Sequence, residues 1–259
     1  MRTVAATRYV TPLREGGSLP ALIEADDDGL YVLKFRGAGQ GPKALVAELL
    51  GGEIARALGL RVPELVFVNL DPVLSRSEPD YEIRSLVKNS GGLNLALDFL
   101  PGALGFDAAR ADTVEPEVAS MIVWLDAFIA NVDRTARNTN LILWHRQLHL
   151  IDHGAALYYQ HDWPHYAGQV ANPFIQIKDH VLLKRAQALE SADQKARSIL
   201  EGHGIEAIVG LIPADWLTAG GDSDDAEAAR AVHRGFLERR LESSSVFVKE
   251  AQRARNTYL

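Results

Sequence analysis

The sequence predicts an α+β fold with two lobes, a strand-rich part over residues 1–100 and a mainly helical part over residues 101–259. Short runs of Val, Leu, Ile and Phe, bounded by Gly, Pro and Asp, recur in the first part and are typical of strands. Longer stretches with apolar residues at helical spacing dominate the second part. Pro101 and Gly102 mark the connector between them, and clefts between lobes are common sites for small ligands.

The N-terminal part is expected to be a small sheet with one helix. Residues 19–25 (LPALIEA) and 30–35 (LYVLKF) form two predicted strands joined by the acidic turn DDDG. A helix is predicted over residues 43–60, because apolar side chains recur there at helical spacing and Gly59 stands near its end. The strand ELVFVNL follows, and after a polar loop come the runs IRSLVKN and LNLALDFL.

The C-terminal part is predicted to contain helices over residues 115–131, 178–202, 204–211 and 225–254. One hairpin interrupts them, made by the alternating runs LILW and LHLI, with Arg146 and Gln147 in its turn. The last helix is highly charged and has few hydrophobic residues, so we expect it to form a solvated surface.

Composition excludes several classes of protein. The chain has 259 residues, 47% hydrophobic and 24% charged, which is typical of a globular protein. A net charge of −7 without a cluster of Lys and Arg argues against nucleic acid as the main ligand. The longest apolar helix is too short to cross a bilayer of about 30 Å, so no membrane partner is expected. The absence of cysteine excludes thiolate chemistry and fits a cytoplasmic protein.

Three oxygen-bearing side chains surround the predicted hairpin in the segment NVDRTARNTNLILWHRQLHLIDHG. Asp133 and Asn138 precede the first strand, and Asp152 closes the second strand, where turn chemistry does not explain a carboxylate. They can converge at one end of the hairpin. Mg²⁺ prefers carboxylate and amide oxygens, with phosphates supplying further ligands.

These residues complete an ordered set. A strand lysine, Lys34, and a helix glutamate, Glu48, precede Asp133, Asn138 and Asp152 in the order that the protein-kinase template uses. Each alone has a structural explanation: Lys34 on an edge strand would reach solvent, and Glu48 would be a solvated helix residue. Chance rarely supplies all five at compatible positions.

The motifs around these residues resemble those of HipA-like kinases. The protein-kinase motifs HRD, DFG and G-x-G-x-x-G-x-V are missing. The segments DRTARN and IDHG resemble the motifs D-R-x-x-x-N and I-D-x-G instead. The segments YVLKF and AELLGGEIARALGLRVPE resemble the N-terminal pattern of HipA-like kinases. The resemblance covers about residues 10 to 155. It implies a bilobal protein-kinase-like fold and phosphoryl transfer from ATP with Mg²⁺.

The resemblance implies a role for each matched residue. Lys34 would bind the α- and β-phosphates with Glu48 as its ion-pair partner, Asp133 would act as base or position the hydroxyl, and Asn138 and Asp152 would hold Mg²⁺. His153 is expected to pack beneath the metal site. Arg134 and Arg137 flank the loop: one of them would steady the transferred phosphoryl group, or both are surface arginines paired with acidic neighbours. Asn140 is expected to cap the loop, with a second metal contact as the alternative.

The nucleotide is expected to contact two further regions. Gly16, Gly17 and Ser18 would cover the phosphates with backbone N–H groups, although GAGQGPK is a second candidate for that cover or a linker into the helix. Adenine would lie against the connector at Asp98, Phe99 and Leu100, with Val32 and, less firmly, Leu97 around it.

The acceptor is left open by the sequence. HipA-like kinases act on protein serine or threonine, but small-molecule kinases share the scaffold. The aromatic segment YYQHDWPHYAGQVANPF either lines the acceptor site or packs between the lobes. Two rival hypotheses are a nucleotide-binding regulatory module without turnover and an interaction domain that binds no nucleotide.

Overall fold

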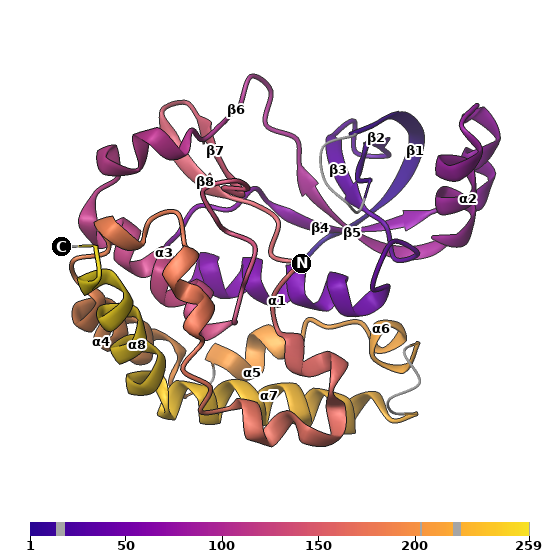
Figure 1. Ribbon diagram of the computed structural model, residues 1–259. Helices are drawn as coiled ribbons and strands as arrows, with labels where there is room; N and C mark the ends of the chain where they lie inside the picture. Colours follow the sequence, from indigo (N-terminus) through magenta and orange to yellow (C-terminus); the bar gives the residue numbers. More distant parts are fainter. Residues whose placement is uncertain (14–18, 203, 220–223, 259) are drawn as a thin grey trace.

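The computed structural model describes residues 1–13, 19–202, 204–219 and 224–258 and has the predicted α+β composition. The first strands form a barrel at one end of the molecule, and the helices that follow residue 115 occupy the other end (Figure 1). The helix α1 (Pro42–Ala57) lies between the two parts. None of the described helices is long and apolar enough to span a membrane.

The barrel contains five strands in the order β1-β2-β3-β5-β4. Their bounds are β1 (Thr3–Pro12), β2 (Ala21–Ala25), β3 (Leu30–Lys34), β4 (Leu65–Leu70) and β5 (Gly92–Asp98). The strand β1, which the sequence did not predict, pairs in parallel with β4 and closes the sheet. Closure removes the free edges of the sheet, so β3 lies between β2 and β5 and is no edge strand.

The expectation of a single helix in this part is wrong. Besides α1, the structure has the 3₁₀ helix η1 (Pro72–Ser77) and the helix α2 (Tyr81–Asn89). Asp80 caps α2 by accepting hydrogen bonds from the N–H groups of Glu82 and Ile83. Ile83 and Val87, four residues apart, bury the inner face of α2 against the barrel.

The hairpin is present, as predicted. It consists of β7 (Leu141–Trp144) and β8 (Gln147–Leu150), and the short strand β6 (Leu104–Gly105) pairs with β7. His145 and Arg146, not Arg146 and Gln147, form its turn, and both have positive φ values of 49° and 64°. Two such residues in a two-residue loop suit the right-handed twist of the strands.

The helical part starts with η2 (Ala108–Thr113) and α3 (Pro116–Phe128). A segment of short 3₁₀ helices follows the hairpin: η3 (Tyr158–His161), η4 (Trp163–Gln169), η5 (Ile175–Asp179) and η6 (Leu183–Arg185). The remaining helices are α4 (Leu189–Leu200), α5 (Gly204–Val209), α6 (Ala214–Thr218), α7 (Ala226–Glu242) and α8 (Ser244–Asn256). The helix predicted to start at residue 178 therefore begins at Leu189.

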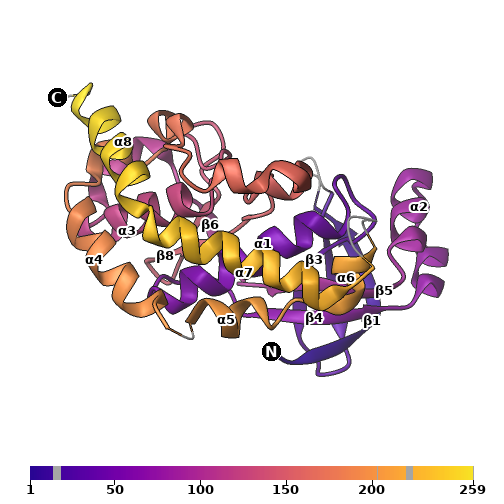
Figure 2. The ribbon, with the colours of Figure 1, turned by 90° about the horizontal axis from the view of Figure 1, so that it is seen from below.

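The C-terminal helices are not the solvated surface that their charge suggested. The predicted helix over residues 225–254 is two helices, and both bury one face. These buried residues are Ala229, His233, Phe236, Leu237, Arg240, Leu241, Ser244, Phe247, Val248, Ala251 and Ala254. Seen from below, α7 runs along the molecule beside α5 (Figure 2).

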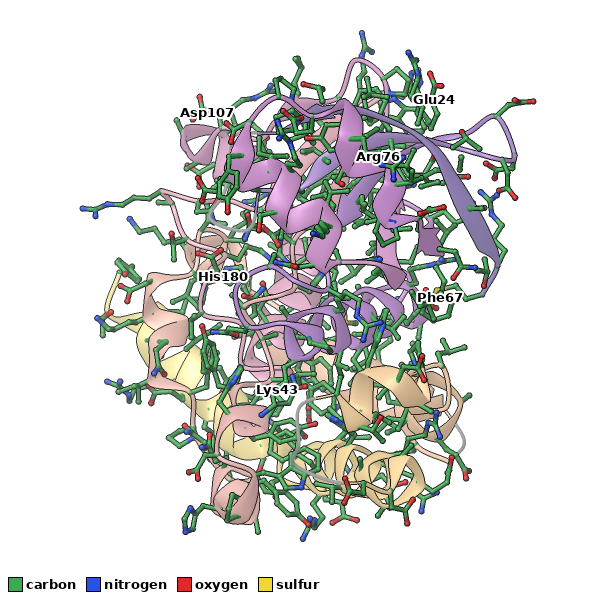
Figure 3. All side chains as sticks on the ribbon, turned by 90° about the vertical axis from the view of Figure 1, so that its right-hand side faces the viewer. Glu24, Lys43, Phe67, Arg76, Asp107 and His180 are labelled. Atoms are coloured by element: carbon green, nitrogen blue, oxygen red, sulfur yellow. The ribbon has the colours of Figure 1, made fainter. Side chains whose placement is uncertain are left out.

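Two hydrophobic cores divide the molecule, and α1 belongs to the larger one. The interior of the barrel and α2 form one core. The apolar side chains of α1 pack instead into the core of the C-terminal helices. Trp216 on α6 reaches the barrel, where it donates to the carbonyl of Leu93 and packs edge-on against Phe67 on β4. Figure 3 shows Phe67 on the side of the barrel that faces the C-terminal helices, and Lys43 between the barrel and these helices.

Candidate functional site

Lys34, at the end of β3, connects the barrel to the hairpin. Its Nζ lies 2.7 Å from Oδ1 of Asp152 and 3.9 Å from Oε2 of Glu48. Only 13% of the side chain is exposed, so the lysine does not reach into solvent. Burial lowers its pKa, but the carboxylates of Glu48 and Asp152 outweigh this effect, and the net pKa is above the ordinary value. The ammonium group is therefore charged at neutral pH.

Glu48 is buried in the middle of α1, so it is no solvated helix residue. Its Oε2 accepts a hydrogen bond of 2.9 Å from the backbone N–H of His153, and its Oε1 is 3.7 Å from Nδ1 of the same residue. Burial raises the pKa of Glu48, but Lys34 and His153 lower it more strongly, to about 2. The carboxylate is thus ionised and fixed to the backbone beside Asp152.

Gly51 allows this close contact between α1 and the hairpin. A Cβ at this position would lie 2.6 Å from Cβ of His153 and 3.2 Å from Cδ1 of Ile129. His153 is completely buried, and neither of its ring nitrogens has a hydrogen-bond partner among the described residues. It packs against α1, and its place beneath a metal site stays a prediction. Gly51 was not among the predicted residues, although a Gly-Gly pair in a helix is an unusual feature that could have marked a close approach.

A buried ion pair holds the loop that carries Asp133. Asp126, near the end of α3, accepts from Nε of Arg134 at 2.6 Å and from Nε2 of His180 at 2.9 Å. The backbone N–H of Leu182 donates to Nδ1 of His180, which assigns the ring proton to Nε2. Burial raises the pKa of Asp126, but Arg134 and His180 lower it below the ordinary value.

Arg134 is therefore neither a surface arginine nor a group that contacts the transferred phosphoryl, and it has a structural role. Its side chain is fully buried, and its Nη1 donates to the carbonyls of Asn140 and Ile151. These carbonyls precede β7 and follow β8, so the guanidinium joins both ends of the hairpin to the loop. This network was not predicted, because Asp126 and His180 lie 8 and 54 residues from their partners in the sequence.

The carboxylate of Asp133 is oriented by two asparagines. Nδ2 of Asn138 donates to its Oδ2 at 2.7 Å, and Nδ2 of Asn140 donates to the same oxygen at 3.1 Å. Asn140 also lies 3.5 Å from the carbonyl of Asp152, so it connects the two acidic residues. The structural interpretation of Asn140 agrees with these contacts.

Asp152 follows β8 in a left-handed conformation, with φ of 58°. Aspartate is enriched in this conformation among non-glycine residues. Its side chain is 37% exposed, which leaves oxygen accessible from the solvent side. Asn138 is also exposed, and its amide oxygen is not engaged by its bond to Asp133.

The predicted adenine contacts lie at the connector after β5. The N–H groups of Asp98 and Phe99 donate to the carbonyls of Glu64 and Leu30, whereas that of Leu100 donates to no acceptor among the described residues. Val32 pairs with Leu97 across β3 and β5, near this connector. Burial raises the pKa of Asp98, and Glu64 raises it further.

The structure describes only one of the two candidate segments for the phosphate cover. Gly16, Gly17 and Ser18 lie outside the described residues. The second candidate, GAGQGPK, forms turns that lead into α1, and the N–H of Gly37 donates to Oγ of Ser90 at the end of α2. These contacts favour the linker interpretation of GAGQGPK.

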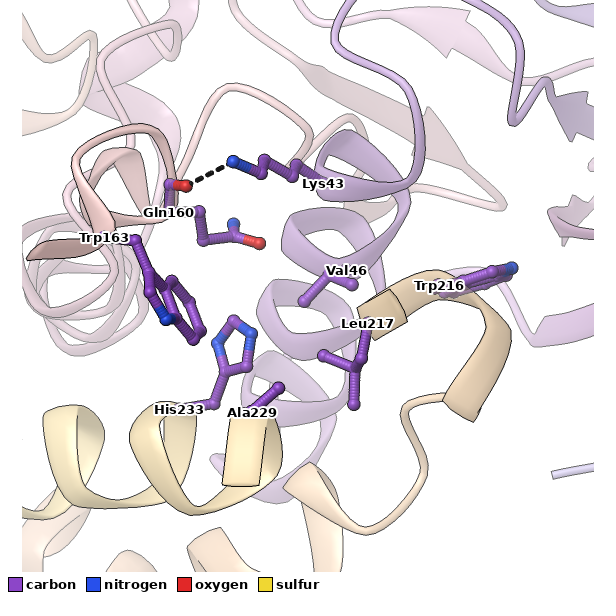
Figure 4. Close-up of a pocket in the computed structure, with 8 residues that line it drawn as sticks. All are labelled: Lys43, Val46, Gln160, Trp163, Trp216, Leu217, Ala229 and His233. Carbon is purple, nitrogen blue, oxygen red and sulfur yellow. Dashed lines mark hydrogen bonds between the residues drawn. The ribbon is translucent and has the colours of Figure 1, made fainter. Parts of the chain in front are cut away.

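The aromatic segment after the hairpin is attached to the molecule by a few buried side chains, and most of its other residues are exposed or half-buried. Tyr159 is buried and stacks on Phe236 of α7 with ring centroids 3.7 Å apart, and Trp163 lies edge-on to His233. Tyr158 is exposed. None of the predicted catalytic, nucleotide or metal residues lines the pocket in this region (Figure 4).

Comparisons with known proteins agree with this geometry. The sequence model of a family described as HipA-like kinase matches residues 7–245. The crystal structure of the Helicobacter pylori proinflammatory kinase CtkA is similar, with a TM-score of 0.55 at 14% identity, covering 98% of this chain and 99% of that chain. No curated protein matches the sequence significantly.

The Golgi casein kinase is also similar in structure. Its TM-score is 0.54 at 12% identity, with 98% of this chain and 76% of that chain covered. A second structure of it, with Mn/ADP bound, gives a TM-score of 0.50 at 15% identity and covers 96% of this chain and 74% of that chain. At these identities the likeness concerns the fold alone, which is that of kinases.

Proposed function

Because this chain belongs to the HipA-like kinase family, we propose that it transfers the γ-phosphoryl group of ATP to a hydroxyl acceptor, with Mg²⁺ as the metal. The ion pair of 2.7 Å between Lys34 and Asp152 carries the proposal, because it unites a barrel lysine with a carboxylate from the hairpin. In this proposal residues 1–100 are the nucleotide-binding lobe, and residues 101–259 are the catalytic lobe. The Mn/ADP bound to the Golgi casein kinase supports a nucleotide and a divalent metal here.

Lys34 would neutralise the charge of the α- and β-phosphates. Phosphoryl transfer needs little covalent chemistry from the protein, so positioning and charge neutralisation supply most of the rate. Glu48 keeps the ammonium group charged and aligned, since it is itself buried, ionised and bonded to the backbone of His153. Asp133 would orient the acceptor hydroxyl and receive its proton, held in place by Asn138 and Asn140.

Asn138 and Asp152 would hold the magnesium ion. Among the described residues no group of three or more His, Cys, Asp or Glu side chains is placed to bind a metal ion alone. Mg²⁺ does not need such a group, because it usually takes one or two protein carboxylates together with phosphate oxygens. The exposed carboxylate of Asp152 and the amide oxygen of Asn138 fit this ligand set. The ion supplies charge neutralisation at the phosphates when it is bound.

The nucleotide base would bind at the connector. The N–H of Leu100 is the donor there that no described residue uses, and Asp98, Phe99 and Val32 surround the position. Gly16, Gly17 and Ser18 remain our candidates for the phosphate cover. The acceptor is proposed to be protein serine or threonine, as in HipA-like kinases, with a small molecule as the alternative.

A non-catalytic nucleotide-binding module is the second candidate, and Asp133 discriminates between the two. Such a module has no physical need for an oriented carboxylate beside the metal ligands. The test compares wild type, Asp133→Asn and the control Asp28→Asn, which changes an exposed carboxylate in the β2–β3 turn at a φ of 62° that asparagine tolerates.

The measurements are ADP formation with γ-labelled ATP, mass spectrometry of the phosphorylated products, and the thermal shift caused by ATP with and without Mg²⁺. We expect Asp133→Asn to lose about 1,000-fold in kcat with an unchanged thermal shift, while Asp28→Asn matches wild type. A magnesium-dependent shift without any turnover in wild type would favour the regulatory module. A wild type that shows neither shift nor turnover would refute nucleotide binding.

A further inference from the structure

The segment after the proposed metal ligand lacks the residues that usually regulate it. Between Asn140 and Ser191 the chain contains no serine or threonine, and its only hydroxyl groups are those of Tyr158, Tyr159 and Tyr166. In many kinases a phosphate in this segment pairs with arginine and orders the segment. A serine/threonine kinase with this sequence cannot phosphorylate the segment itself, so another interaction must order it.

Backbone hydrogen bonds fix both ends of the segment, residues 155–180. At its start, the N–H of Leu157 donates to the carbonyl of Ile129 at 2.8 Å. At its end, the N–H of Val181 donates to the carbonyl of Arg134 at 3.1 Å, and Thr135 forms a β-bridge with His180. The start of the segment is therefore attached to the end of α3, and its end to the loop that carries Asp133.

Arg240 on α7 fixes the middle of the segment. Its Nε and Nη2 donate to the carbonyls of Phe128 and Ala127, the last residues of α3, at 2.6 and 2.7 Å. Its Nη1 donates to three carbonyls of the segment, those of Val170 at 2.9 Å, Asn172 at 3.1 Å and Gln169 at 3.3 Å. One guanidinium group thus joins the segment to α3, the helix that leads into the loop that carries Asp133.

The environment of Arg240 is that of a permanent anchor. The side chain is 1% exposed, and its hydrogen bonds among the described residues all go to backbone carbonyls. Its charge is balanced by carbonyl dipoles, including those at the C-terminal end of α3, where cations are favoured. Burial lowers its pKa to about 10, so the group still carries its charge at neutral pH. The planar guanidinium group of arginine can donate to carbonyls in several directions at once, whereas the single ammonium group of lysine cannot reach all of them.

A second residue on the same face of α7 holds the start of the segment. His233, seven residues before Arg240, is hydrogen-bonded through Nδ1 to the hydroxyl of Tyr159 at 2.5 Å. Nearby, Nζ of Lys43 on α1 donates to the carbonyl of Gln160 at 2.7 Å (Figure 4). The segment is therefore held between α7 and the helix that carries Glu48.

We propose that Arg240 is a positioning residue that orders residues 155–180 in place of a phosphorylated side chain, so that activity does not require phosphorylation of this segment. The inference rests on the proposed kinase function. In regulated kinases, a phosphate bound by a cluster of arginines orders this segment. Here the buried face of α7 would order it instead.

The test uses the full chain after phosphatase treatment, with the unphosphorylated state verified by mass spectrometry. The variants are Arg240→Lys, Tyr159→Phe, which removes only a hydroxyl and keeps the ring stacked on Phe236, and the control Arg253→Lys on the exposed face of α8. We measure kcat and KM for ATP, and hydrogen exchange of amides 155–180.

Unphosphorylated wild type and Arg253→Lys should have full activity. Arg240→Lys should lose about 10-fold or more in kcat with an unchanged KM for ATP, because nucleotide contacts stay intact while the catalytic loop is displaced. Its segment amides should exchange at least about 10-fold faster, and those of Tyr159→Phe should exchange faster between residues 157 and 165.

Loss of activity on dephosphorylation that rephosphorylation restores would overturn the proposal, as would wild-type kcat in a folded Arg240→Lys. If wild type shows no phosphoryl transfer at all, the proposed function fails. Hydrogen exchange of residues 155–180 then tests only whether Arg240 anchors the segment. Unchanged exchange of the segment in Arg240→Lys would overturn the anchoring role, whatever the activity.

Discussion

Replacing Gly51 by alanine tests the contact between α1 and the hairpin. The new Cβ would lie 2.6 Å from Cβ of His153, about 0.8 Å closer than the shortest ordinary contact of 3.4 Å. The contacted atom is bonded to the backbone next to Asp152, so no rotamer change can relieve the clash. Either the hairpin or α1 must move, and α1 carries Glu48.

The expected effects on stability and on activity differ. Alanine in a helix interior stabilises by about 1 kcal/mol relative to glycine, whereas overpacking costs about 1–3 kcal/mol. The free energy of unfolding should therefore fall by at most about 2 kcal/mol. A displacement approaching 1 Å between catalytic groups costs about 100-fold in rate. We expect kcat for ATP turnover to fall by about that factor in a protein that remains folded.

Gly52→Ala is a matched control in the same helix. Its Cβ would also lie at 2.6 Å from a neighbour, but that neighbour is Cδ1 of Leu65 on β4, the far end of a flexible side chain. We expect this variant to keep kcat within about threefold of wild type. Urea denaturation and a coupled ADP assay on both variants give the comparison. Equal kcat values for Gly51→Ala and Gly52→Ala would refute the argument.

Two further predictions concern buried polar groups. Asp126→Asn presents a donor to a site surrounded by the donors of Arg134 and His180, so urea denaturation should show a loss of about 3 kcal/mol or more. The control Asp193→Asn keeps an acceptor for Nε1 of Trp124 and should lose under about 1 kcal/mol; equal losses would contradict the role of the network. Burial lowers the pKa of His233 to about 4 from an ordinary 6.5, so the unfolded chain binds this proton more tightly. The free energy of unfolding should therefore fall by about 3 kcal/mol from pH 6.5 to pH 4. His233→Gln should reduce this pH dependence, and an equal dependence in both proteins would show that other groups cause it.

Local patterns predicted the elements that bury one regular face. The strands β2, β3, β4 and the helix α1 appear close to their expected bounds, because their apolar residues repeat with the period of the element. The sequence order predicted a common site for Lys34, Glu48, Asp133, Asn138 and Asp152. In the structure, Nζ of Lys34 lies within 4 Å of a carboxylate oxygen of Glu48 and of Asp152. Asn138 and Asp133 meet as neighbours in one loop.

Features that depend on distant partners could not be predicted in this way. The burial of Arg134 requires Asp126 on one helix and His180 beyond the aromatic segment. The buried face of α7 contains His233 and Arg240, which a hydrophobic pattern does not register, so the helix was taken for a solvated surface. In β1 few residues are buried, and its pairing with β4 spans about 60 residues of sequence.

The position of α1 restricts how such a protein can be switched. In kinases the lysine and the helix glutamate must both be in place, and displacement of that helix is one route to an inactive state. Here Leu45, Leu49, Leu50 and Ile54 of α1 are buried in the core of the C-terminal helices. Exposing these four side chains would cost about 6–12 kcal/mol, far more than the roughly 1–3 kcal/mol of a typical allosteric coupling. Glu48 is therefore held in place by the packing of α1 in the core, so displacement of this helix is not available as a switch without partial unfolding.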